Sequence, residues 1–138
     1  KNTTFARTRI RNLLMKLKQE GFDDKKLKQT IKNLSDADNS INFYENQNIK
    51  LNVNYLKNNS AYILNESFFK QPNEVVFRSF SSLLRKVGGK YYAARGKKIN
   101  QTIHQINVKK FNKATLSGCI IEKVSNSVII YRENREKK

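Results

Sequence analysis

The sequence predicts an α+β fold that is mainly helical, with antiparallel helices followed by a smaller unit of helix and β-hairpin. Apolar residues recur at helical spacing in four segments, and shorter stretches alternate or run apolar as strands do. Clusters of Gly, Pro, Asn and Ser separate these segments. The chain of 138 residues suits one ordinary domain or two small ones that share a surface, and we expect one packed body.

Residues 1–50 are predicted to form two antiparallel helices. The first runs from about Phe5 to Gln19, and Gly21 ends it. The second starts at Asp23 or Asp24 and continues to about Asn48. Each helix carries one apolar stripe. The stripes consist of Ile10, Leu13, Leu14 and Leu17 in the first helix and of Leu27, Ile31, Leu34 and Ile41 in the second.

Residues 51–138 are predicted to form the helix-and-hairpin unit. Residues 51–64 alternate around a turn at 57–60, which indicates a small hairpin. Pro72 opens an amphipathic helix that ends at Gly88 and Gly89, and a further helix follows through residues 99–106. Two apolar runs, 115–124 and 128–132, predict a second hairpin that closes the fold.

Charge is the strongest indication of function. The chain has 28 Lys and Arg against 11 Asp and Glu, a formal net charge of +17, which favours a polyanionic partner and above all nucleic acid. The alternative is codon bias, since Lys, Asn and Ile are all plentiful. No apolar run approaches the roughly 20 residues that span a bilayer, and a single cysteine excludes an internal disulfide. We therefore expect a cytoplasmic protein with no membrane partner.

The excess of charge is concentrated between Arg78 and Lys113, where ten Lys or Arg occur in 36 positions without one acid. A glycine-flanked loop in this stretch also carries two tyrosines, which suits contact with phosphates and unpaired bases. The alternatives are a solvated surface for the cations and core packing for the tyrosines. The predicted RNA-binding residues here are Arg78, Arg85, Lys90, Tyr91, Tyr92, Arg95, Lys97 and Lys98.

A second group of cations, Arg7, Arg9, Arg11 and Lys18, is predicted to bind RNA from the first helix. The alternative is pairing within the fold, with Asp38 as the partner of one of these arginines because it falls in the apolar stripe of the second helix. A further alternative is that Ser35 and Asp38 form a capping box that restarts the helix and leaves Asp38 exposed.

No catalytic residue and no metal site is predicted. The sequence has no glycine-rich phosphate loop of known form, no cluster of ligands at metal spacing and no nucleophile with a histidine base nearby. His104, the one histidine, is expected on the surface, and Cys119 is expected to pack in the core.

Three stretches, in order, resemble the part of bacterial tRNA(Ile)-lysidine synthases that follows the N-terminal ATP-pyrophosphatase domain. The first, residues 5–14, is similar to the family's Arg-rich helix. Residues 76–84, with Gly88, Gly89 and Arg95, resemble its helix–glycine–arginine pattern. Residues 114–119 and 130–133 are similar to its Thr-Leu-x-Gly-Cys and Arg-Glu strand pair. A histidine that is frequent after Arg-Ile-Arg in the family is Asn12 here, so no role is taken from it.

The resemblance implies the tRNA-binding, non-catalytic fragment of a ligase that forms a C–N bond. Such an enzyme uses ATP, with Mg, to attach lysine to the wobble cytidine of tRNA(Ile). The family's nucleotide loop is missing from this sequence, so we expect ATP, catalysis and a partner domain upstream of Lys1, and a fragment that binds no cofactor and is inactive alone. The alternative is a free-standing nucleic-acid-binding or ribosome-associated basic protein.

Overall fold

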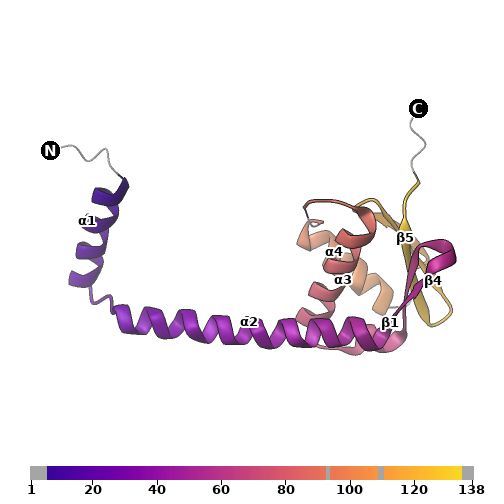
Figure 1. Cartoon of the computed structure of the whole chain (residues 1–138), viewed down its shortest axis with the longest axis horizontal. Helices are drawn as coiled ribbons and strands as arrows, with labels where there is room; N and C mark the ends of the chain where they lie inside the picture. Colours follow the sequence, from indigo (N-terminus) through magenta and orange to yellow (C-terminus); the bar gives the residue numbers. More distant parts are fainter. Residues whose placement is uncertain (1–5, 93, 109–110, 135–138) are drawn as a thin grey trace. The chain divides into compact units, whose positions relative to one another are not determined.

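The computed structural model describes residues 6–92, 94–108 and 111–134, and these form an α+β fold that is mainly helical, as predicted (Figure 1). The chain divides into two compact units, residues 1–39 and residues 40–138. The division falls inside a helix, whereas the sequence placed it near residue 50. We describe each unit by itself.

The first unit contains α1 (Ala6–Gln19) and the start of α2 (Asp24–Asn52). Gly21 follows α1 with φ +90°, a conformation that glycine adopts without strain. The side chain of Asp23 caps α2, because its Oδ1 accepts a hydrogen bond of 2.8 Å from the backbone N–H of Lys25. Both predicted helices are therefore confirmed, and α2 continues four residues past Asn48.

The apolar stripes of these two helices are not buried among the described residues. α1 has no buried residue, and Ile10, Leu14 and Leu34 are 56%, 41% and 65% exposed. Helical spacing shows that a helix has an apolar face, but it does not show which surface covers that face. The sequence therefore predicted both helices and their apolar faces, but not the exposure of those faces.

The second unit is built on one five-stranded antiparallel sheet with the strand order β1-β2-β5-β4-β3. Its strands are β1 (Val53–Leu56), β2 (Ala61–Leu64), β3 (Lys113–Leu116), β4 (Cys119–Val124) and β5 (Ser127–Arg132). The first predicted hairpin is confirmed as β1 and β2. The second is larger than predicted, because a turn at Ser117 and Gly118, both with positive φ, divides the run 115–124 into two strands.

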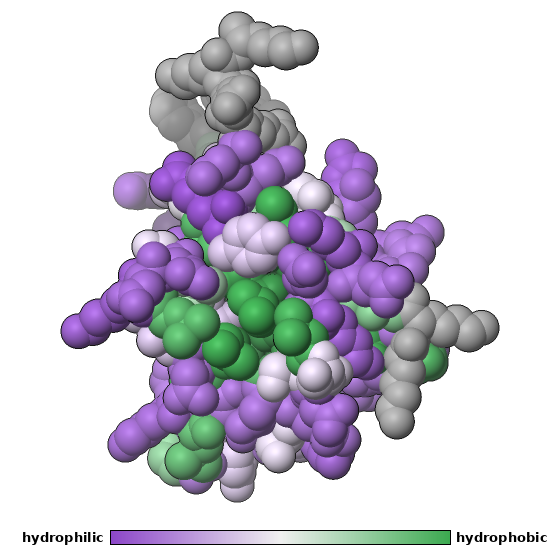
Figure 2. Space-filling model, turned by 90° about the vertical axis from the view of Figure 1, so that its right-hand side faces the viewer, coloured by the Kyte–Doolittle hydropathy of each residue, from purple (hydrophilic) through white to green (hydrophobic). Residues whose placement is uncertain are grey.

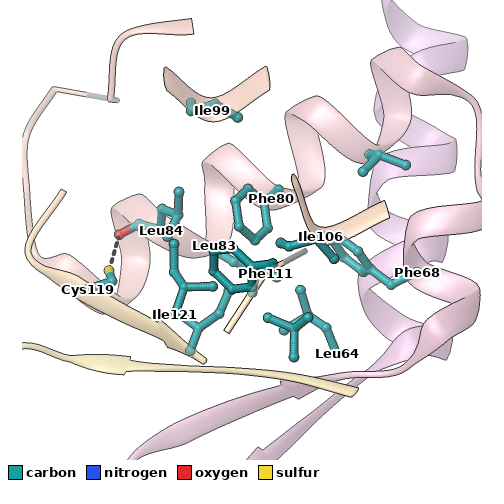
Figure 3. Packing of buried hydrophobic residues seen from close by; sticks show 13 residues of the cluster. Leu64, Phe68, Phe80, Leu83, Leu84, Ile99, Ile106, Phe111, Cys119 and Ile121 are labelled. Carbon is teal, nitrogen blue, oxygen red and sulfur yellow. Dashed lines mark hydrogen bonds between the residues drawn. The ribbon is translucent and has the colours of Figure 1, made fainter. Parts of the chain in front are cut away.

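Two helices lie on one face of this sheet, α3 (Asn73–Gly88) and α4 (Gly96–Asn107), and both were predicted (Figure 1). Short 3₁₀ turns, η1 (Lys57–Asn59) and η2 (Glu66–Lys70), connect the other elements. Figure 3 shows the core between helices and sheet. It includes Leu64, Phe68, Phe80, Leu83, Leu84, Ile99, Ile106, Phe111, Cys119, Ile121, Val128 and Ile130.

The last turns of α2 are attached to this core through buried polar side chains. The amide of Asn48, which is 3% exposed, donates to the backbone oxygen of Phe68 and to the hydroxyl of Ser79, both at 3.3 Å. Its own oxygen accepts from Asn52 at 2.8 Å. α2 is therefore joined to α3 and η2 by a satisfied hydrogen-bond network.

The opposite face of the sheet is only partly covered. Strand alternation places Ile63, Ile120 and Ile129 on this face, where all three are half-buried. Figure 2 shows apolar side chains at the centre of the side of the molecule turned to the viewer, with hydrophilic side chains around them. The sheet thus has one face in the core and one face that is apolar but not packed by a helix of the second unit.

Candidate nucleic-acid interface

The candidate interface begins where the end of α3 meets the turn between β3 and β4. A Cβ atom on Gly88 would overlap the backbone oxygen of Ser117, so only glycine fits there. The thiol of Cys119 donates a hydrogen bond of 3.2 Å to the backbone oxygen of Leu84, drawn in Figure 3. Gly89, with φ +61°, then ends the helix. These contacts fix the point from which the basic loop leaves α3.

Two tyrosines protrude from this loop. Tyr91 is 88% exposed and Tyr92 is 80% exposed, which excludes core packing, the alternative that the sequence left open. Their rings meet edge to face, with centroids 5.0 Å apart and planes at 84°. Two large aromatic rings that face water are unfavourable in free energy, and contact with a partner would bury them and remove this cost.

A shallow, open hollow lies between the tyrosine pair and the end of α3. Its lining residues are Ser82, Arg85, Lys86, Lys90 and Tyr91. The ammonium of Lys86 also lies 5.5 Å from the ring centroid of Tyr62, within the range of a cation–π contact. A neighbouring hollow along α3 shares Ser82 and Arg85 with the first. The two hollows follow each other along α3, and the second is lined by Glu45 as well as by Arg78 and Arg85.

Cations at the two ends of the basic stretch are neutralised by acids that lie outside it. Arg78 forms an ion pair of 2.8 Å with Glu74, one turn earlier on α3, and donates to Asn42 at 3.3 Å. Lys113 lies 3.3 Å from Glu122, and hydrogen bonds with Tyr131 and with this carboxylate raise the pKa of the lysine. Arg78 is therefore paired with an acid in the free protein, and its contact with RNA stays a prediction.

The cations in the middle of the stretch are different. They form no ion pair with any residue that the structure describes, and all are exposed: Arg85, Lys86, Lys90, Arg95, Lys97 and Lys98. The sequence prediction omitted Lys86 and Ser82, although Lys86 could have been found because it follows Arg85 directly. Lys109 and Lys110 lie outside the described residues.

Three of these cations surround the start of α4. Arg95 is the residue before the helix, and Lys97 and Lys98 lie in its first turn, which has no acid. The start of a helix carries partial positive charge from its free backbone N–H groups, so cations there repel it. This arrangement is unfavourable for the free protein and becomes favourable when an anion is bound.

The predicted cations of α1 belong to the first unit and are described separately. Arg7, Arg9 and Arg11 are exposed on the helix, and Lys18 forms an ion pair of 2.7 Å with Asp24. The structure therefore presents three of the four as solvent-facing cations and gives the fourth an acidic neighbour.

Asp38 lies exposed on α2, so the burial that would have required an arginine partner is not found. The apolar stripe that contains Asp38 is itself exposed there, and the carboxylate keeps contact with water. The capping-box alternative is also wrong, because α2 is continuous from Asp24 to Asn52 and no helix restarts at Ser35.

The acidic, histidine and cysteine side chains of the described residues are scattered rather than clustered. The described residues contain no group of three His, Cys, Asp or Glu side chains that could hold a metal ion. His104 is exposed on α4, as predicted. Cys119 is fully buried, also as predicted, and burial raises the pKa of its thiol to about 11. Within the described parts of the chain, no helix is long and apolar enough to cross a membrane.

Comparison of the chain with models of protein families, with curated proteins and with solved structures found no match. The segment from Arg85 to Lys98 combines an exposed aromatic pair, a hollow and six cations that form no ion pair with a described residue.

Proposed function

We propose that this chain binds RNA, and tRNA in particular, as a non-catalytic part of an enzyme that uses ATP to attach lysine to the wobble cytidine of tRNA(Ile). The surface that binds it is α3, the loop 89–95 and the start of α4. The observation that carries the proposal is the exposed pair Tyr91 and Tyr92 in a segment with six cations that form no ion pair within the described part of the chain.

The choice of RNA over other polyanions follows from combining charge with aromatic rings. Phosphates are attracted by Lys and Arg, and the release of their counterions drives binding. Unpaired bases stack on exposed tyrosines, which duplex DNA or an acidic protein surface would not use. The cations at the start of α4 add to the same field.

The assignment to a tRNA-modifying enzyme rests on the resemblance to lysidine synthases. Two of the three stretches that carry it pack together in the second unit, since Gly88 lies against Ser117 and Cys119 bonds to Leu84. These four residues fix the start of the basic loop together, which gives a physical reason for them to occur in the same protein. The proposal includes ATP with Mg in a catalytic domain of the same protein and a cytoplasmic location.

The proposed binding surface is tested by the salt dependence of tRNA(Ile) affinity. If all six cations meet phosphates, log Kd should change with log salt with a slope of about 4 to 5.5. Replacing Arg95, Lys97 and Lys98 together by Ala should reduce that slope by about two to three. The stability of the fold should not change, since exposed loop cations contribute little to it.

A matched control removes the same charge elsewhere. The triple variant Lys25→Ala, Lys26→Ala and Lys28→Ala takes three exposed cations from α2. Its slope should stay closer to that of the parent. If the variants at residues 95–98 bind tRNA as tightly and with the same slope as the parent, the proposed surface is wrong.

The non-catalytic role is tested by incubating the chain with ATP, Mg, lysine and tRNA(Ile). We expect no modified cytidine by nucleoside mass spectrometry, because the sequence has no glycine-rich phosphate loop of known form and the described residues hold no cluster that could bind a metal ion. Formation of lysidine by this chain alone would contradict the proposal. Equal affinity for tRNA(Ile) and for unrelated RNA would instead favour a free-standing nucleic-acid-binding protein.

A further inference from the structure

We propose that the hollow beside Tyr91 is a binding site for a single unpaired nucleotide. The inference rests on the proposed RNA binding and adds to it the form of RNA that the surface selects. In this site the base stacks on the ring of Tyr91, and its phosphate lies between Arg85 and Lys90.

The lining of the hollow has the groups that a nucleotide needs. Arg85 and Lys90 supply charge, the hydroxyl of Ser82 can donate or accept a hydrogen bond, and Tyr91 supplies a flat apolar wall. The volume of about 490 Å³ falls in the range of roughly 300–1,000 Å³ that is typical of small-molecule sites. Among the described residues no acid lines the hollow, so nothing there repels phosphate.

Lys86 also lines the hollow, and it lies near an aromatic ring of the sheet. Its ammonium lies 5.5 Å from the ring centroid of Tyr62, which stands on β2 in the sheet. A cation held against an aromatic ring loses less side-chain entropy on binding a phosphate than a free lysine does. The sheet therefore contributes to the site through Tyr62.

The tyrosine pair provides one stacking surface rather than two. Successive stacked bases are parallel, whereas the rings of Tyr91 and Tyr92 stand at 84° to each other. Only one ring can lie flat against the base in the hollow, and only Tyr91 lines it. Tyr92 supports Tyr91 through an edge-to-face contact of 5.0 Å. The two tyrosines should therefore contribute unequally.

This geometry selects unpaired RNA. A base inside a duplex has both faces covered by its neighbours and cannot offer one to Tyr91, whereas a base in a loop or at an end can. A duplex can still meet the cations through its phosphates. Charge alone would not distinguish the two forms of RNA, so the distinction depends on the aromatic wall.

The test compares two probes bound to the full chain, a single-stranded RNA of 12 nucleotides and a blunt RNA duplex with the same number of phosphates. Tyr91→Leu should weaken binding of the single strand roughly 5- to 150-fold and leave duplex affinity and salt slope unchanged. Tyr91→Phe should bind like the parent. Tyr92→Leu should cause a smaller loss than Tyr91→Leu.

The chain offers a matched control in a second exposed aromatic pair. Phe43 and Tyr44 on α2 also meet edge to face, at 5.5 Å and 82°, and both are exposed. Tyr44→Leu should leave the affinity for both probes unchanged. Because Tyr91 is 88% exposed, the variants should unfold at the same urea concentration as the parent.

Failure of the nucleotide site and failure of RNA binding give different results. If the parent binds the single strand but Tyr91→Leu binds it equally well, or weakens both probes alike, the nucleotide site is wrong while RNA binding stands. If the parent binds neither probe, RNA binding itself is wrong, and the nucleotide site falls with it.

Discussion

At the scale of single residues, Gly88 shows how a backbone contact determines which residue type can occupy a position. It sits in the last turn of α3, where its backbone packs against the turn between β3 and β4, and a methyl group would overlap the oxygen of Ser117. Glycine is therefore needed at position 88 for helix and turn to approach each other, and this contact positions the basic loop.

We predict that Gly88→Ala destabilises the protein by about 1–3 kcal/mol, the usual cost of overpacking, because helix and turn must move apart. Gly96→Ala is the matched control, since its added Cβ would meet the Phe77 ring at an ordinary 3.5 Å. Urea unfolding followed by circular dichroism measures both. A Gly88→Ala variant as stable as the parent would show that the turn can move freely.

Cys119 gives a prediction about pH. Its buried thiol has a pKa of about 11, above the reference value of 9.0, so the folded protein keeps the proton while the unfolded chain loses it. Stability should therefore be unaffected below pH 9 and should fall as pH rises from about 9 to 11, by roughly 1–3 kcal/mol.

The thiol contribution is isolated by comparing the parent with Cys119→Ala, because lysines and tyrosines titrate over the same pH range in both. The variant should be less stable at pH 7, since it leaves a small cavity, but its stability should fall less steeply above pH 9. If the plots of stability against pH are parallel for the two proteins, Cys119 does not contribute to the pH dependence of stability.

The sequence predicted some residue environments and missed others. The core position of Cys119 followed from strand alternation, and the exposure of His104 followed from the helical face opposite three isoleucines. The pairing of Arg78 was missed because Glu74 lies one helical turn before the basic stretch, outside the segment whose charges were counted. Asp38 was misplaced because an apolar stripe was taken to be a buried one.

At the scale of secondary-structure elements, local patterns predicted the helices and two hairpins, but not how the hairpins join into one sheet. Each helix has apolar residues at helical spacing and a Gly or Asp near one end. Both signals can be recognised within the segment itself. The pairing of β2 with β5 joins residues more than sixty positions apart, and no local pattern predicts it. The division between β3 and β4 was also missed, because Ser117 takes a positive φ that is uncommon for a non-glycine residue.

The buried amide network predicts how α2 depends on the core. Asn48→Ala removes the donor to Phe68 and Ser79 and the acceptor for Asn52, which leaves buried polar groups without partners. We expect a loss of about 1–3 kcal/mol in the free energy of unfolding. Gln47→Ala, one position earlier and exposed, is the control and should change stability by less than about 0.5 kcal/mol.

At the scale of the whole molecule, burial and charge are distributed differently. Among the described residues none before Asn48 is buried, so the hydrophobic core belongs entirely to the second unit. Cations, in contrast, occur in both units. The net charge of +17 repels itself in the free protein, and a bound polyanion relieves that repulsion.

This distribution predicts that residues 40–138 fold without the first unit. Their core keeps all its buried residues, and the network around Asn48 lies within them, so the midpoint of urea unfolding should match that of the full chain. The six cations and Tyr91 are retained, so binding of the single-stranded RNA should also persist. Removal of Arg7, Arg9 and Arg11 should lower the salt slope by about 0.7 for each phosphate that these arginines contact, and by no more.

A clear loss of stability on removing residues 1–39 would mean that the exposed stripes of α1 and α2 are covered in the full chain. A loss of RNA binding without a loss of stability would instead move the principal RNA contact to the first unit. Measuring unfolding and affinity on the same truncated protein separates these cases, because stability depends on the buried core and affinity depends on the exposed cations and rings.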